Sequence, residues 1–234
     1  AVRAAPDRLQ VETGRTVFEA DRVWSTIPNG LLVRLLDPPA PADVLDAADR
    51  LELRAMLLVY LVVDAARFTE YDAHYFPAAD IPFTRLSEPK NYAALAERAS
   101  RPPTVLCAEI PCDTADAVWS LDDAALGELV RDGLARAGLP LTAPIREVVS
   151  RRLPAAYPIY RTGYESALRP VDDHIAATPR LLTFGRQGLF AHDNTHHALA
   201  MARAAVGCLR DDGRFDDEGW RAHRAVFETH VVED

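Results

Sequence analysis

Alternating and continuous apolar positions predict several β-strands in this chain. Apolar and polar residues alternate over 9–12 and again over 16–19, a pattern typical of a β-hairpin. A fuller apolar segment at 22–27 predicts a third strand. The uninterrupted apolar stretch at 56–63 predicts a strand that is buried on both faces.

Leucine and valine recur every three or four residues over 122–137, which predicts an amphipathic helix that Gly138 ends. Residues 164–177 are also helical in pattern, although we expect Pro170 to kink or split that helix. The other predicted helices lie at 31–36, 43–51, about 196–210 and about 216–230, and the other predicted strands at 74–76, 83–86, 104–110, 145–153 and 181–184. Prolines at 38, 39 and 41 indicate a linker and a domain boundary.

One stretch near the end of the chain combines a strand, a glycine and a helix start. The strand at 181–184 runs directly into Gly185, and a polar loop then leads to an alanine-rich helix. Asn194 or Thr195 can cap that helix, which leaves the backbone amides of 196–198 facing outward with a partial positive charge. This arrangement presents N–H groups to an anionic ligand. The spacing alone also fits an ordinary strand-to-helix connection.

Charge and composition exclude some functions. The 234 residues carry a net charge of −9, and a single lysine, Lys90, stands among 26 basic residues. An acidic chain is poorly suited to nucleic acid or an anionic membrane surface. No apolar run of about 18 residues is present, so no membrane span is predicted. Three cysteines without a CxxC pair predict no disulfide framework, and we expect a cytoplasmic protein.

Other chemical motifs are scarce. His192, His196 and His197 are potential metal ligands, but no carboxylate or cysteine completes an obvious set, so no metal site is predicted. The chain contains no GxSxG, no P-loop and no GxGxxG motif. It opens in what reads as the middle of a strand, so we expect further sequence upstream.

The tail from Gly185 to Ala198, GRQGLFAHDNTHHA, resembles the C-terminal FAD-binding motif of the protoporphyrinogen oxidase/amine oxidase superfamily. It is most similar to the branch that resembles UDP-galactopyranose mutase. Segments 20–28, 75–77, 83–91, 109–112 and 156–160 resemble further parts of that branch, in the same order along the chain. Related tails often carry methionine and aspartate where this chain has Thr195 and His196, which alters the rim facing the flavin.

This resemblance implies a mixed α/β flavoprotein of two domains. Residues 1–30 and 179–234 would form part of an interrupted, Rossmann-like FAD-binding domain. Residues 31–178 would form a substrate domain with a mixed or antiparallel sheet and flanking helices. The GxGxxG half would lie upstream in the same polypeptide or in a separate subunit, as a partner of this chain.

The resemblance also implies a set of site residues. The FAD-binding positions would be Val2, Thr26, Pro28, Gly185, Arg186, Gly188, Phe190, Asn194, His196, His197 and Ala198. Candidate contacts to a small-molecule substrate are Tyr60, Arg85, Tyr157 and Tyr160. No catalytic residue is assigned, because hydride transfer to a flavin needs no protein base.

We therefore expect an FAD-dependent oxidoreductase that oxidises a small organic substrate by hydride transfer. Two alternatives stay open. One is a non-redox sugar-nucleotide mutase, in which Arg85 and Arg161 would hold the diphosphate. The other is a flavin-free interaction subunit that kept the fold without the nucleotide-binding half.

Overall fold

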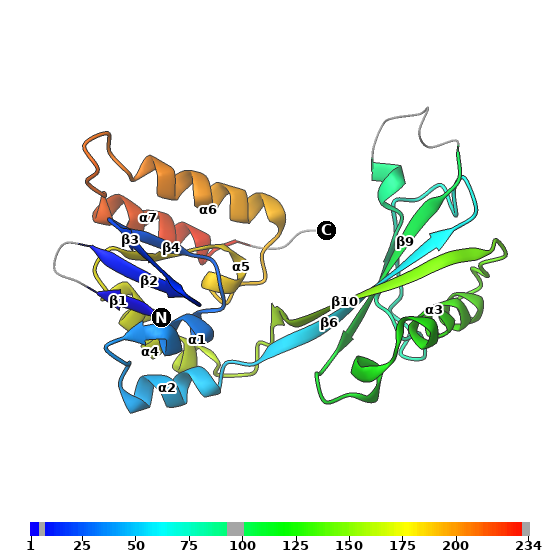
Figure 1. Cartoon of the computed structure of the whole chain (residues 1–234), viewed down its shortest axis with the longest axis horizontal. Helices are drawn as coiled ribbons and strands as arrows, with labels where there is room; N and C mark the ends of the chain where they lie inside the picture. Colours follow the sequence, from blue (N-terminus) through cyan, green and yellow to red (C-terminus); the bar gives the residue numbers. More distant parts are fainter. Residues whose placement is uncertain (5–7, 93–100, 231–234) are drawn as a thin grey trace. The chain divides into compact units, whose positions relative to one another are not determined.

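The computed structural model describes residues 1–4, 8–92 and 101–230. The chain divides into two compact units (Figure 1). The first contains Ala1–Leu53 and Tyr157–Asp234, and the second is the continuous stretch Arg54–Ala156. Each unit has its own sheet, helices and apolar core, so the second is an insertion within the first.

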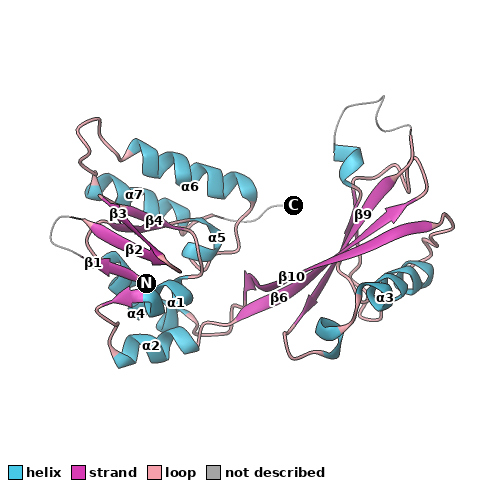
Figure 2. Ribbon diagram, viewed as in Figure 1, coloured by secondary structure: helices cyan, strands magenta, loops and turns pink. Residues whose placement is uncertain are grey.

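The first unit contains a four-stranded sheet with strand order β3-β2-β1-β5 and a parallel pair, β11-β4 (Figure 2). The bounds of its strands are β1 Val2–Ala4, β2 Leu9–Thr13, β3 Thr16–Ala20, β4 Val23–Ser25, β5 Leu36–Asp37 and β11 Leu181–Thr183. The predicted hairpin is confirmed, because β2 pairs antiparallel with β3. Its turn passes through Gly14, whose φ of 57° favours a residue without a side chain.

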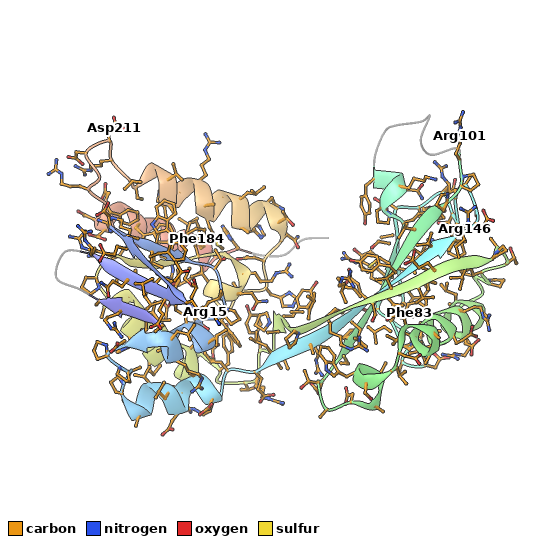
Figure 3. The ribbon with its side chains drawn as sticks, in the orientation of Figure 1. Arg15, Phe83, Arg101, Arg146, Phe184 and Asp211 are labelled. Carbon is orange, nitrogen blue, oxygen red and sulfur yellow. The ribbon has the colours of Figure 1, made fainter. Side chains whose placement is uncertain are left out.

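Helices of the first unit form two apolar cores with these strands. The helices are α1 Asn29–Leu32, α2 Ala42–Asp49, α4 Glu165–Ala176, α5 Gly185–Gly188, α6 Thr195–Gly207 and α7 Asp217–Phe227, with a 3-10 turn, η1, at Val33–Leu35. One core joins α1, α2 and α4 to β1 and contains Leu32 and Val171. The other joins α6 and α7 to β11 and contains Met201 and Trp220. Phe184, labelled in Figure 3, belongs to this second core.

The second unit is built on a five-stranded sheet with strand order β10-β6-β9-β8-β7. Its elements are β6 Leu53–Val63, β7 Ala73–Tyr75, β8 Arg85–Ser87, η2 Pro89–Tyr92, β9 Thr104–Cys112, η3 Ala117–Ser120, α3 Asp123–Arg136 and β10 Ile145–Pro158. The pairs β6–β9, β9–β8 and β8–β7 are antiparallel. The predicted strand at 56–63 is confirmed, but only one of its faces is fully buried. Leu57, Val59 and Leu61 have no exposed surface, whereas Leu58, Tyr60 and Val62 on the other face are partly exposed.

Two glycines let α3 approach its neighbours closely. A Cβ on Gly133 would lie 2.6 Å from Cε1 of Phe83, which is fully buried (Figure 3). A Cβ on Gly127 would lie 2.7 Å from Cγ2 of Val148 in β10. The helix ends before Gly138, as predicted, and this residue has a φ of 76°.

Three sequence predictions differ from the structure. The proline-rich stretch 38–41 lies inside the first unit, where Ala40 is buried, so it is not a boundary between units. Helix α4 continues through Pro170 and is not split. Residues 185–188 form a helical turn, α5, where a loop was expected.

The predicted domains were 1–30 with 179–234, and 31–178. The compact units instead divide the chain between residues 53 and 54 and between residues 156 and 157. The difference arises because α1, α2 and α4 pack into the core of the first unit. The mixed α/β prediction is confirmed. Within the described residues, no helix is both long and apolar enough to cross a bilayer.

Candidate functional site

The segment that the sequence singled out forms a strand, a tight turn and a helix. Strand β11 pairs in parallel with β4, and the backbone turns at Gly185 with a φ of 80°. A side chain would be strained in this conformation, so the turn requires glycine. The amide of Gly185 points to Sδ of Met201 at 3.1 Å, which ties the turn to α6.

The structure brings several predicted flavin residues together at the ends of β4 and β11. A Cβ on Gly188 would lie 3.2 Å from the carbonyl oxygen of Ser25 and 3.6 Å from Cα of Thr26. The missing side chain at Gly188 therefore lets α5 pack against the end of β4. Pro28 follows at the start of α1. Val2, by contrast, belongs to the four-stranded sheet and is buried in the core around Leu32.

Hydrogen bonds hold the loop between α5 and α6. The hydroxyl of Tyr160 donates to the carbonyl oxygen of Phe190 at 3.2 Å and accepts from the amide of His192 at 2.8 Å. Nε of Arg186 donates to the carbonyl oxygen of Asp193 at 2.8 Å. Phe190 has a φ of 51°, unusual for a bulky residue, and is buried. These bonds stabilise a loop conformation that the backbone alone disfavours.

Aromatic rings line the same loop. The Arg186 guanidinium lies 4.6 Å from the ring centre of Tyr157, and Tyr157 stacks on His192 at 5.0 Å. Burial and the nearby Arg186 charge lower the pKa of His192, and burial raises the pKa of Tyr160. Two of the four predicted substrate contacts, Tyr157 and Tyr160, thus lie against the predicted flavin segment.

A hollow of about 700 Å³ opens beside this loop. Its walls include Tyr160, Tyr164, Phe190, His192, Asp193 and His230. The loop that precedes α6 is therefore not sealed inside the core. The lining also carries charged side chains, among them Arg169, Asp172 and Glu228, and a cavity of this size can hold a small molecule.

The start of α6 is capped as predicted, but its open amides are not the predicted ones. Asn194 is the N-cap and forms a capping box with His197, whose Nδ1 accepts from the Asn194 amide at 3.2 Å. The amide of Ala198 bonds to the carbonyl oxygen of Asn194. The prediction of open amides at 196–198 is thus wrong for His197 and Ala198. Within the described part of the chain, the first-turn amides without an acceptor are those of Thr195 and His196.

Residues 2–205 match the family model described as flavin containing amine oxidoreductase. The chain belongs to this family. The predicted membership of the flavin amine oxidase superfamily is confirmed.

Solved structures show the same fold as this chain. A reduced UDP-galactopyranose mutase has a TM-score of 0.70 at 18% identity, over 96% of this chain and 48% of its own. A putrescine oxidase triple mutant has a TM-score of 0.59 at 17% identity, over 98% of this chain and 48% of its own. A provisionally named protoporphyrinogen oxidase from Exiguobacterium sp. 255-15 has a TM-score of 0.58 at 21% identity, over 80% of this chain and 40% of its own. The chain thus spans less than half the length of each of these three structures. A search of the curated proteins gave no match.

The other two predicted substrate contacts lie in the second unit. Tyr60 on β6 pairs with Cys107 on β9, and Arg85 on β8 pairs with Glu109 on the same strand. Nε of Arg85 donates to Oε1 of Glu109 at 3.0 Å. The carboxylate raises the pKa of Arg85, although burial opposes this, so the side chain stays charged.

Sequence reasoning missed two members of the site. Asp193 and His230 meet His197, so a carboxylate does complete a potential ligand set, contrary to the sequence-based interpretation. The sequence could have indicated Asp193, because it directly precedes the predicted helix cap, Asn194. His230 follows α7, far along the chain, and no spacing rule connects it to α6.

Proposed function

We propose that this chain is the C-terminal part of an FAD-dependent oxidoreductase that oxidises a small organic substrate by hydride transfer to the flavin. One observation supports this most directly. In a chain that belongs to the flavin-containing amine oxidoreductases, a hollow is lined by the loop that connects a glycine turn to a helix start with two open amides. That combination suits a ligand with a flat ring and a polar, electron-rich edge.

The residues present fit such a cofactor. Gly185 supplies a turn that no side chain could adopt without strain. The amides of Thr195 and His196 and the dipole of α6 would stabilise negative charge at the cofactor's edge. Flavin, when bound, would accept the hydride. Arg186 and Tyr160 hold the loop around this position and so keep these groups preorganised.

The substrate would contact the aromatic side chains at the hollow. Tyr160 lines the hollow, and Tyr157 stacks on His192, another of its lining residues. Tyr60 and Arg85, in the second unit, stay predicted substrate contacts. Arg85 already forms an ion pair with Glu109. Carboxylates outnumber arginines in the lining of the hollow, which disfavours a strongly anionic group there.

The mutase alternative needs arginines that are free to hold a diphosphate. Arg161 instead forms a two-pronged pair with Glu52, with both N···O distances at 2.6 Å. Arg85 is paired with Glu109. Both candidate arginines are already neutralised by a carboxylate, so we favour the oxidoreductase.

Co-expression tests the proposal. The chain is purified alone and together with a polypeptide that supplies a GxGxxG nucleotide-binding half, and the visible absorption of oxidised flavin is recorded. We expect a yellow complex that a reducing substrate bleaches. A colourless complex would contradict the proposal and favour the flavin-free subunit. Activity that requires prior reduction but consumes no electrons would instead identify a mutase.

A further inference from the structure

Three side chains from separate parts of the first unit converge beside the start of α6. They are Asp193 in the preceding loop, His197 in the first turn and His230 after the end of α7. Oδ1 of Asp193 lies 3.3 Å from Nδ1 of His197 and 3.6 Å from Nδ1 of His230. The two imidazole rings are stacked, with centres 4.4 Å apart.

The carboxylate at this cluster is buried without enough partners. Asp193 is 3% exposed, and within the described residues its Oδ2 accepts no hydrogen bond. Nδ1 of His230 is likewise buried and has no hydrogen-bond partner there. Arg186 bonds to the backbone carbonyl of Asp193 and so does not neutralise the carboxylate. Buried charged or polar atoms without partners are costly, which indicates that another group completes this cluster.

The carboxylate-to-imidazole distances suit a metal ion. Ligands about 2.0–2.2 Å from a tetrahedral ion lie roughly 3.3–3.6 Å from one another, and the two Oδ1–Nδ1 separations of 3.3 Å and 3.6 Å fall in that range. All three ligand atoms lie within 4.8 Å of one another. Because the two rings are stacked, one imidazole must turn about its side-chain bonds before both lone pairs point at one ion. Two imidazoles and one carboxylate form a common ligand set for zinc and for iron, which leaves open coordination positions.

One ligand nitrogen already has its lone pair available. Nδ1 of His197 accepts a hydrogen bond from the Asn194 amide, so this nitrogen carries a lone pair and not a proton. A metal ion would take the lone pair that now accepts the capping bond.

We propose that Asp193, His197 and His230 bind one divalent transition-metal ion of the zinc class. The ion would join the start of α6 to the end of α7 and satisfy the buried carboxylate. Asp193 and His230 also line the 700 Å³ hollow, so a coordination position would open toward it for water or another ligand. The cluster shares His197 with the predicted flavin positions, but metal binding by this chain does not require flavin.

A titration with Co²⁺ tests the site, because the ion's visible bands report its coordination. The 234-residue chain is first freed of metal with a chelator, and Zn²⁺ stoichiometry is measured separately by elemental analysis. We expect one ion per chain, displaced by Zn²⁺. Asp193→Asn and His230→Gln, each removing one ligand, should weaken binding at least about tenfold.

His223→Gln serves as the matched control, because it removes an exposed histidine from α7 outside the cluster. This variant should bind Co²⁺ as the parent does. Circular dichroism establishes that each variant is folded, and the two independent ligand variants keep the test decisive if one of them is not. Absence of saturable binding by the folded parent, or equal binding by folded Asp193→Asn, would overturn the proposal.

Discussion

At the scale of single residues, Tyr160 has the most concentrated structural role near the hollow. Its hydroxyl both donates to Phe190 and accepts from His192, and its ring stacks on Tyr164 with centres 4.6 Å apart. One side chain thus fixes two backbone groups of the loop before α6. The loop conformation includes the positive φ of Phe190, so its stability depends on these bonds.

We expect Tyr160→Phe to lower the free energy of unfolding by about 1–2 kcal/mol, because it leaves a donor and an acceptor without their partner. Urea unfolding followed by circular dichroism measures the change. Tyr164→Phe is the matched control, since within the described residues no hydrogen bond of its hydroxyl is found. Equal effects of the two variants would show that the ring, rather than the hydroxyl, stabilises the loop.

Ala198→Asp tests the flavin placement at one position. Ala198 lies in the first turns of α6, where a carboxylate would repel an electron-rich cofactor edge while leaving the helix favourable. We expect a clear loss of flavin from the co-expressed complex, measured as the ratio of visible to protein absorbance. Ala200→Asp, an exposed position on the same helix, should retain flavin. Unchanged occupancy in Ala198→Asp would contradict the placement of this helix end.

The stability of the first unit should depend on His197 in mild acid. Burial lowers the pKa of His197 below its ordinary value of 6.5, so the unfolded chain binds more protons below that pH. The free energy of unfolding should therefore fall as the pH is lowered from about 6.5. In metal-free buffer, His197→Gln should make this slope shallower, with a remainder from His192, whose pKa is also lowered. An unchanged slope would contradict this assignment.

At the scale of elements, the apolar pattern of the sequence correctly predicted the strands that depend on interactions between nearby residues. The hairpin at 9–20 and the buried β6 follow from period-two alternation and continuous apolar sequence. Helix α4 shows the limit of a local rule, because packing of Val171 and Ile175 in the core holds the helix through Pro170. Local pattern likewise missed α5, whose four residues depend on close packing against β4.

Two glycines in helices should respond to alanine in opposite directions. Gly133→Ala places a methyl group against the buried Phe83 ring, and we expect a net loss of about 1–2 kcal/mol in the free energy of unfolding. Gly207→Ala, where nothing lies within 4 Å of the added Cβ, should gain up to about 1 kcal/mol. Thermal and urea unfolding measure both. The same sign for both variants would contradict the close packing of α3.

The candidate site was predictable only where its residues are close in sequence. The strand, glycine and capped helix at 181–198 follow one another, so motif reasoning located them. The contribution of Tyr160 to the loop and of His230 to the cluster depends on tertiary folding, which brings α4 and α7 alongside that segment. No pattern within a short window carries that information.

At the scale of the whole molecule, the second unit is an insertion with adjacent ends. The amide of Ile159 donates to the carbonyl oxygen of Glu52 at 2.9 Å, immediately before and after the inserted residues. The buried core of the second unit includes residues from Ala55 to Leu134, and none of them belongs to the two cores of the first. Each unit therefore has the internal contacts of an independent folding unit.

Removal of residues 54–156 should leave the first unit folded. We expect a chain in which an Asn-Gly turn joins Leu53 to Tyr157 to unfold in one cooperative thermal transition, because the two ends already lie side by side. Circular dichroism measures the transition, and the separate 54–156 polypeptide provides the comparison. A gradual, non-cooperative melt of the joined chain would show that its cores need the inserted unit.

The adjacency of Glu52 and Ile159 has a consequence for how such proteins diversify. A host whose two cut ends meet tolerates the exchange of everything between them, because any replacement must only begin and finish at neighbouring points. Genetic recombination at these two positions could then supply a different inserted module while the part around α6 stays intact. Chimaeras made at this junction would offer engineers a route to new specificity without redesign of the host.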